Sequence, residues 1–174
     1  IEIENELKEE VNAVKIFGIY NPEDNNFNLN MWSNTEAEQI RSSFKRINKI
    51  KLSNTSSKLF ENAILSFAYP PNGMSNDEFI DLRVKWMIDN KKTKLIENFL
   101  KQNKNFPNKK KLIQYLVDGN IAKANIKEGC LKISFLDKNI KDSYLEKFKI
   151  YCLIYNKKIN EAQLQFDILR EEKK

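Results

Sequence analysis

The C-terminal half of the chain alternates apolar helical stripes with short breaks that contain asparagine. Within each stripe, apolar residues recur every three or four positions, which is the spacing of one helix face. The breaks lie at residues 89–90, 118–120 and 155–156, and the asparagines in them are 30 and then 36 residues apart. Because each break separates two stripes, the pattern predicts three pairs of helices.

The first helix of each pair is expected over residues 76–88, 108–118 and 142–155. Short helices that are polar on most of their surface are stable only when their apolar stripe packs against a neighbour. The short gaps between helices require antiparallel hairpins, and the spacing brackets the period of tetratricopeptide repeats. We therefore predict an all-α fold, an α-solenoid of stacked antiparallel helix hairpins that is tetratricopeptide-like.

Serine residues followed by glutamate indicate where several helices begin. In a capping box the serine caps the first turn and the glutamate three positions later returns a bond to the serine backbone. The chain has this pattern at Ser33–Glu36, Ser75–Glu78 and Ser143–Glu146, and a further helix is expected after residues 53–55. The pattern therefore places two helices before the three pairs.

The N-terminal region is the least regular part of the chain. A short helix is possible over residues 2–15, and the apolar residues that follow a strong turn are expected to pack as an irregular arm on the first helices. The proline-containing break at residues 69–73 is the longest one. It predicts an N-terminal arm and helical lobe over residues 1–73, packed continuously with three helix-hairpin repeats over residues 74–174.

The net charge of +6 suggests a nucleic-acid partner only weakly. Only four of the 30 basic residues are arginine, which reads phosphate and guanine better than lysine does. The densest basic run, Lys109 to Lys111, opens a helix, where cations oppose the helix dipole. A phosphate-binding patch is one interpretation of this run, and we favour a solvated helix face.

No pattern in the chain predicts an enzyme. Histidine is absent, and there is no glycine-rich phosphate loop and no serine-centred elbow motif. The carboxylate pairs Asp77 with Asp81 and Glu171 with Glu172 lie on polar helix faces or near a terminus, so we interpret them as solvated. We predict no catalytic, cofactor-binding or metal-binding residues, no cofactor, and no membrane-spanning segment, since no window approaches 18 apolar residues.

The two cysteines fall on helices that would be neighbours in a solenoid. Cys130 lies on the second helix of the second pair, and Cys152 lies on the first helix of the third pair. The expected geometry therefore allows a disulfide bond between the two residues. The alternative is a pair of reduced core cysteines, since free cysteine is commonly buried.

Aromatic residues are the candidates for contact with a partner. Tyr144, Tyr151 and Tyr155 share one helix face, at positions i, i+7 and i+11. Tyrosine and tryptophan suit such contacts because they combine a large apolar area with a polar tip, and we add Trp86 and Tyr115 to the candidates. The alternative is that these rings are buried in the hydrophobic core, which is the more frequent location of an aromatic stripe at helical spacing.

Several segments of the chain together match one family of proteins. They are Ile19-Tyr20-Asn21-Pro22, Asn30-Met31-Trp32, Ser57-Lys58-Leu59-Phe60, Ala68-Tyr69-Pro70-Pro71-Asn72-Gly73, Leu82-Arg83-Val84, residues 144–152 and residues 167–171. Through these segments the chain resembles an uncharacterised family of exported alphaproteobacterial helical-repeat proteins of unknown function. The resemblance implies an exported, periplasmic protein without an assignable activity, and both cysteines match cysteines of the family. An oxidising periplasm would favour the Cys130–Cys152 disulfide. The lysine- and asparagine-rich composition departs from the alanine- and arginine-rich composition of many relatives.

These observations favour a non-enzymatic helical-repeat scaffold or adaptor that binds a protein partner in the bacterial envelope, along a concave face lined by the first helices of the pairs. The alternatives are a basic nucleic-acid-binding helical domain, an accessory repeat domain of a larger envelope enzyme, and an envelope hydrolase that acts through carboxylates. A cytoplasmic location is the alternative to the periplasm. Of the partners, a protein is expected and nucleic acid is not.

Overall fold

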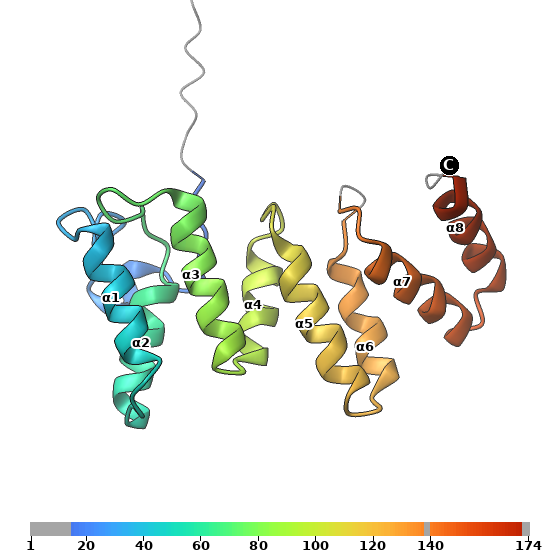
Figure 1. The fold of residues 1–174 in the computed structure, drawn as a ribbon, viewed down its shortest axis with the longest axis horizontal. Coiled ribbons are helices and arrows are strands. Elements are labelled where there is room, and N and C mark those ends of the chain that lie inside the picture. The colour runs from blue at the N-terminus through green and yellow to red at the C-terminus, as the bar shows by residue number, and fades with distance from the viewer. Residues whose placement is uncertain (1–14, 138–139, 172–174) are drawn as a thin grey trace, which may run out of the picture. The chain divides into compact units, whose positions relative to one another are not determined.

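The computed structural model describes residues 15–137 and 140–171, and the regular secondary structure of these residues is helical (Figure 1). The all-α prediction is confirmed, because no strand is formed within the described residues. The helix predicted over residues 2–15 lies outside them, apart from its last residue. The described elements are η1 (Pro22–Asn25), α1 (Ala37–Ile47), α2 (Asn54–Leu65), α3 (Asn76–Asp89), α4 (Thr93–Gln102), α5 (Lys109–Ile121), α6 (Ile126–Lys132), η2 (Ile133–Phe135), α7 (Ser143–Tyr155) and α8 (Ile159–Glu171), where η denotes a 3-10 helix.

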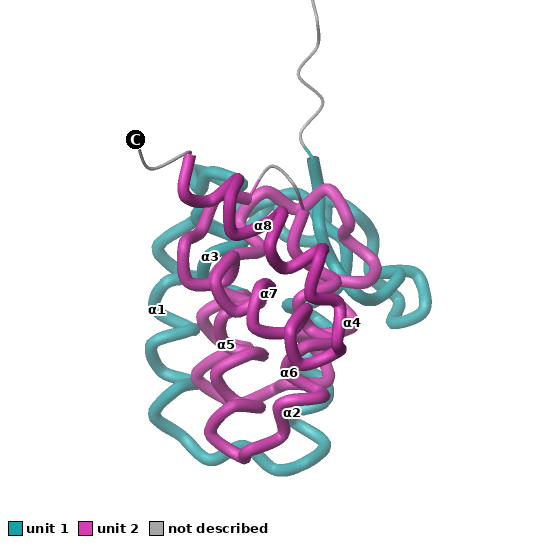
Figure 2. Tube along the Cα trace, turned by 90° about the vertical axis from the view of Figure 1, so that its right-hand side faces the viewer, with its two compact units in different colours: residues 1–83 teal, residues 84–174 magenta. Residues whose placement is uncertain are grey.

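The chain divides into two compact units, Ile1–Arg83 and Val84–Lys174, which Figure 2 colours separately. The division falls within α3, whereas the sequence suggested a boundary between residues 73 and 74. Helix α3 therefore contributes its first part to unit 1 and its last part to unit 2.

An extended N-terminal segment is built into unit 1. The Ile19 amide donates to the Leu65 carbonyl (2.6 Å), and the Phe67 amide donates to the Tyr20 carbonyl (3.1 Å). Gly18 permits this close approach, because a Cβ atom at this position would lie only 2.6 Å from the amide nitrogen of Phe67. The described part of the predicted arm is therefore held to the end of α2 by backbone hydrogen bonds.

Arg83 is a buried cation within unit 1. Its Nη1 donates to the carbonyl oxygens of Phe17 (2.9 Å), Ile64 (3.3 Å) and Ser66 (3.4 Å), and its guanidinium carbon lies 4.2 Å from the centroid of the Phe79 ring. Burial lowers the pKa of Arg83 to about 10, because apolar surroundings disfavour the charged form. Its Nε and Nη2 have no hydrogen-bond partner among the described residues. Arg83 thus joins the N-terminal segment, α2 and α3.

The first two helices begin close to the predicted positions. Helix α2 starts after Ser53, whose side chain accepts a hydrogen bond from the Ser56 amide (3.1 Å). Helix α1 starts later than expected, and its capping box is formed by Glu36 and Gln39 rather than by Ser33 and Glu36. The prediction of the helix was right, and the prediction of its capping residues was wrong.

The start of α3 follows only half of the predicted capping box. Ser75 Oγ accepts from the Glu78 amide (3.2 Å), as expected. The Glu78 carboxylate does not return to the Ser75 backbone, since it accepts two hydrogen bonds from Arg41, at 2.6 and 2.9 Å. These bonds lower the pKa of Glu78 and tie α1 to α3 within unit 1.

Helices α3, α5 and α7 end in the same way. After each helix one residue has a left-handed backbone conformation: Lys91 (φ 53°), Ala124 (φ 55°) and Lys157 (φ 60°). The amide that follows each of them donates to the carbonyl five residues earlier, at 2.8–2.9 Å, which is the Schellman arrangement of a helix C-terminus. The three left-handed residues are evenly spaced along the chain, and the next helices, α4, α6 and α8, begin at the same constant interval.

The asparagines of the predicted breaks take part in these helix ends. The side-chain amides of Asn90, Asn120 and Asn156 each donate to the carbonyl four residues earlier, at 3.0, 2.7 and 2.8 Å. Helix α5 continues past Asn120 to Ile121, so the helix ends later in the chain than the break predicted at residues 118–120. The asparagines are therefore unevenly spaced, although the left-handed residues that follow the three helices are evenly spaced.

The helices of unit 2 pack mainly against their sequence neighbours. Helix α5 contacts α6 and helix α7 contacts α8, while α4 contacts α5 and α6 contacts α7. The core of α5 consists of fully buried apolar side chains, as the predicted stripe requires: Leu112, Ile113, Leu116 and Val117.

Candidate binding surface

Three tyrosines form an exposed stripe on α7, which we call the tyrosine face: Tyr144, Tyr151 and Tyr155. Their exposed fractions are 43%, 47% and 49%. The ring of Tyr151 stacks on that of Tyr155, with centroids 6.5 Å apart and planes at 21°. These side chains are therefore surface residues, and the alternative that the stripe belongs to the core is wrong.

The tyrosine face rests on a buried aromatic ring. Phe148 stacks against Tyr151, with centroids 5.9 Å apart and planes at 15°. Phe148 also approaches Gly129 of α6 so closely that a Cβ atom there would lie 3.3 Å from its ring. The absent side chain of Gly129 thus leaves room for the ring that supports the exposed stack.

A covalent link holds α7 against α6 beside this ring. The Sγ atoms of Cys130 and Cys152 lie 2.08 Å apart and their Cα atoms 5.4 Å apart, the distances of a disulfide bond. The structure therefore brings together the two cysteines that the sequence placed on neighbouring helices.

A hydrogen bond links α5 to the tyrosine face. The hydroxyl of Tyr144 donates to the Asp118 carboxylate. Burial, together with this hydrogen bond, raises the pKa of Tyr144 to about 12, so the hydroxyl remains a donor at neutral pH. Tyr115 and Asp118 also line a hollow of about 650 Å³ in unit 2, whose other walls include Lys91 and Lys132. Three of the predicted tyrosines thus lie on α7, and the fourth, Tyr115, lines a hollow whose walls come mainly from α4, α5 and α6.

The start of α7 is fixed by Asp142 and not by the predicted box of Ser143 and Glu146. Asp142 accepts from the Leu145 amide (2.9 Å), from Lys110 (2.7 Å) and from Gln114 (3.3 Å). Burial alone would raise the pKa of Asp142, but the hydrogen bonds from Lys110, Leu145 and Gln114 lower it below its ordinary value. Asp142 therefore fixes the N-terminus of α7 to α5.

The basic run at residues 109–111 is not simply a solvated face. Lys109 is buried and forms an ion pair with Asp137, and Lys110 pairs with Asp142. Lys111 is exposed, as expected. Because carboxylates from the segment before α7 neutralise two of the three lysines, the run fixes α5 to that segment.

Trp86 does not belong to the candidate surface. Its side chain is buried, so a partner could not contact it without opening the core. The sequence alone does not distinguish the exposed rings of the tyrosines from the buried ring of Trp86. The difference comes from how the helices pack.

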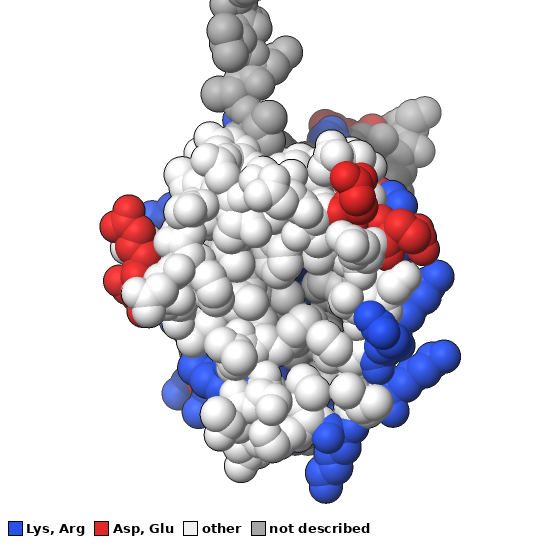
Figure 3. All heavy atoms as spheres, turned by 90° about the vertical axis from the view of Figure 1, so that its left-hand side faces the viewer, with Lys and Arg blue, Asp and Glu red and all other residues white. Residues whose placement is uncertain are grey.

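Charged side chains do not gather on the face of unit 1 that Figure 3 shows. Lysine, arginine, aspartate and glutamate lie towards its margins, and its centre is uncharged. Asp77 and Asp81 in unit 1 are exposed, as expected; Glu171 in unit 2 is exposed as well, and Glu172 lies outside the described residues. Asp77, Asp81 and Glu171 are therefore open to solvent and not shielded as an acid–base pair would be.

The described residues contain neither a metal-binding cluster nor a membrane helix. Across residues 15–137 and 140–171, no group of three or more histidine, cysteine, aspartate and glutamate side chains is arranged to hold a metal ion. In the same residues, no helix has both the length and the apolar character needed to cross a membrane. Comparisons with models of protein families, with curated proteins and with solved structures found no match.

Sequence reasoning missed the polar residues that hold the surface in place. Asp118 accepts a hydrogen bond from Tyr144, 26 positions away in the chain, and Asp142 accepts one from Gln114, 28 positions away. No local pattern reveals contacts of this range. A weak signal existed for Asp142, since aspartate directly before a helical stripe is a favoured N-cap residue.

Proposed function

We propose that this protein is a non-enzymatic helical-repeat scaffold that binds another protein through the tyrosine face of α7. The observation that carries the proposal is the exposed stack of Tyr151 and Tyr155, supported by the buried ring of Phe148. A rigid aromatic pair loses little side-chain freedom on binding and offers a large apolar area with polar tips.

Three recurring features support a repeat array of the α-solenoid, tetratricopeptide-like kind over α3–α8. The left-handed residues that end α3, α5 and α7 are evenly spaced, and the first residues of α4, α6 and α8 follow the same interval. This interval also separates Phe79, Leu112 and Leu145, all fully buried. A constant interval of about 33 residues is typical of stacked helix pairs, which present extended surfaces to other proteins.

We place the protein in the bacterial envelope, with the periplasm as its compartment. The Cys130–Cys152 pair at bonding distance supports this location, because disulfide bonds persist in oxidising compartments and are rare in the cytosol. The resemblance to an exported helical-repeat family is consistent with it. A cytoplasmic location is the alternative, for which both thiols would be free in the cell.

Nucleic-acid binding is the less favoured function. It would require lysines with free charges collected on one surface, whereas Lys109, Lys110 and Lys132 all form ion pairs with carboxylates. Electrophoretic mobility of labelled RNA and DNA with the protein at low salt distinguishes the two functions. A salt-dependent shift would favour the nucleic-acid function over the scaffold.

Site-specific photo-cross-linking tests the scaffold function. A photoreactive amino acid replaces Tyr155 on the tyrosine face or, as the control, the exposed Lys94 on α4, and both forms are irradiated in the native cell. We expect a discrete cross-linked protein from position 155, and its loss when Tyr151 is changed to serine in the same chain. Equal cross-linking from both positions, or none from position 155, would argue against the tyrosine face as the binding site.

A further inference from the structure

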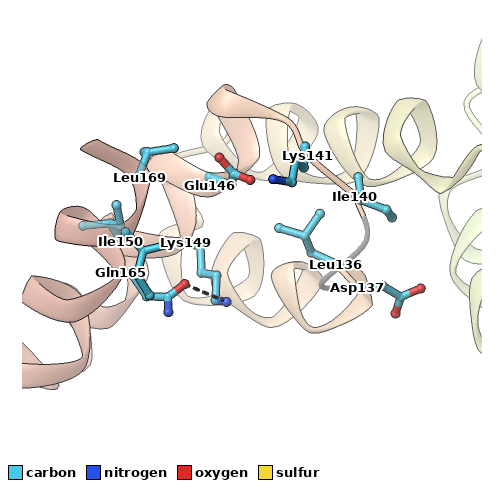
Figure 4. A pocket seen from close by; sticks show the side chains of 10 residues that line it. Leu136, Asp137, Ile140, Lys141, Glu146, Lys149, Ile150, Gln165 and Leu169 are labelled. Atoms are coloured by element: carbon cyan, nitrogen blue, oxygen red, sulfur yellow. Dashed lines mark hydrogen bonds between the residues drawn. The ribbon is translucent and has the colours of Figure 1, made fainter. Parts of the chain in front are cut away.

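Helices α5 and α7, which the structure describes completely, bring a single carboxylate to the tyrosine face. Each helix has one carboxylate, Asp118 on α5 and Glu146 on α7. Asp118 accepts the hydrogen bond from the Tyr144 hydroxyl. Glu146 lines a hollow of about 370 Å³ between the segment before α7, α7 itself and α8 (Figure 4). It follows Tyr144 by two positions, a spacing at which side chains do not share a helix face, so it lies away from the tyrosines.

The lysines of the same two helices fall into two groups. The first two lysines of α5 pair with carboxylates. Lys149 of α7 donates from Nζ to the Gln165 side chain (3.2 Å) at the hollow of Figure 4, as the dashed line marks. Lys111 of α5 and Lys147 of α7 are exposed and form no ion pair among the described residues. These two lysines are therefore the unpaired cations of α5 and α7.

Both unpaired lysines lie at the tyrosine face. Lys147 is three residues after Tyr144 and four before Tyr151, and side chains at these spacings are neighbours on a helix surface. Lys111 is seven residues before Asp118, about two helical turns, so it lies on the side of α5 that Tyr144 reaches. The tyrosine face thus combines aromatic area with two unpaired positive charges and one carboxylate that is already hydrogen-bonded.

The openness of this face does not come from the position of α7 in the last described pair. The constant interval between the helix pairs places Tyr151 level with Asp118 on α5 and with Lys85 on α3. Both residues are exposed, although a further helix pair follows each of them. The positions level with Tyr155 are exposed in both earlier pairs as well. A following pair thus leaves this side of the first helix open.

We propose that the tyrosine face binds an acidic segment of the partner protein, in which aspartate or glutamate stands beside an apolar side chain. This inference rests on the proposed function, because it names the chemistry of the partner at the same surface. The apolar side chain packs on the stack of Tyr151 and Tyr155, and the carboxylates pair with Lys147 and Lys111. Nucleic acid fits this surface less well, because α5 and α7 contain no arginine and the Asp118 carboxylate repels phosphate.

Photo-cross-linking from position 155 tests the inference, with the native cell extract as the source of the partner. Lys147→Glu is the test variant, since it reverses the charge in the middle of the tyrosine face, and Lys147→Arg keeps that charge. Lys94→Glu is the matched control, because Lys94 is an exposed lysine on α4, outside the face. The cross-linked product is digested and identified by mass spectrometry, and a second sample is treated with nuclease.

We expect Lys147→Glu to lower the yield of the cross-linked protein by about fivefold or more, because an opposite charge becomes a like charge, and Lys147→Arg and Lys94→Glu to change it by less than about twofold. The partner peptide attached at position 155 should contain aspartate or glutamate.

Equal yields from all forms, or an attached peptide without carboxylates, would overturn the inference and leave the scaffold function standing. Absence of a product from the chain with unchanged Lys147 would overturn the scaffold function and this inference with it. A product that nuclease removes would overturn the inference in favour of nucleic acid.

Discussion

At the residue scale, two glycines show how differently the same residue can act. A Cβ atom at Gly18 would lie 2.6 Å from a backbone nitrogen that hydrogen bonds hold in place. Gly119 lies within α5, and beyond its chain neighbours and its own helix backbone no atom lies within 4 Å of the equivalent position. The first glycine is required by packing, and the second only weakens a helix.

Substitution by alanine therefore has opposite expected effects at these two positions. Gly18→Ala should lower the free energy of unfolding by about 2–3 kcal/mol, because backbone atoms must move apart. Gly119→Ala should raise it by about 0.5–1 kcal/mol, through its better helix propensity. Urea unfolding followed by circular dichroism measures both, and a destabilising Gly119→Ala would contradict the description of α5.

Asp142 makes the stability of α7 depend on pH. Its pKa is lower in the folded chain than in the unfolded chain, so its stabilising contribution is complete above the unfolded value of about 4 and is lost as the pH falls through the folded value. Asp142→Ala should cost about 2 kcal/mol at pH 7 and clearly less at pH 3.

Urea unfolding at both pH values measures this difference. Asp81→Ala is the control, because Asp81 is exposed on α3, and it should change the free energy of unfolding by no more than about 0.5 kcal/mol. An equal cost of Asp142→Ala at pH 7 and pH 3 would show that the carboxylate charge does not hold α7.

At the element scale, the disulfide joins two consecutive helix pairs. The cysteines are 22 residues apart in the chain, and closing a loop of this length stabilises a protein by about 3 kcal/mol in the chain-entropy model. We expect reductant to lower the melting temperature of the wild-type chain and to leave that of Cys130→Ser/Cys152→Ser unchanged.

Intact mass before and after reduction gives an independent check of the disulfide. The oxidised chain should be lighter by two hydrogen atoms. If reductant lowered the melting temperatures of the wild type and of Cys130→Ser/Cys152→Ser equally, the disulfide bond would not be the cause of the change.

The sequence predicted the helices themselves well, because their apolar stripes and asparagine ends are local patterns. It predicted only some of the residues that cap them, such as Ser75 at the start of α3. Glu78 was expected to cap its own helix, but Arg41 on another helix binds it. Lys109 was interpreted as solvated, but Asp137, which lies beyond the next helix in the chain, pairs with it. Contacts of this range leave no mark on the spacing of nearby residues.

At the scale of the whole molecule, the candidate surface could be predicted only in part. Helical spacing placed the three α7 tyrosines on one face, and this face is exposed. Trp86 was included as a candidate for its residue type, and it is buried. Periodicity identifies residues that share a face, but it does not tell whether a neighbouring helix covers that face. The disulfide partners were found because only two cysteines had to be paired.

The most direct test of the scaffold function compares the proteins retained by three immobilised forms of the chain, by quantitative mass spectrometry of the native cell extract. The forms are the wild type, Tyr151→Ser/Tyr155→Ser, and the control Ile159→Ser/Leu164→Ser, which removes two apolar side chains of α8 that are more exposed than the tyrosines. We predict at least one protein that the wild type and the control retain and that the tyrosine variant loses by about tenfold or more. Retention of the same proteins by all three forms would contradict the proposed function.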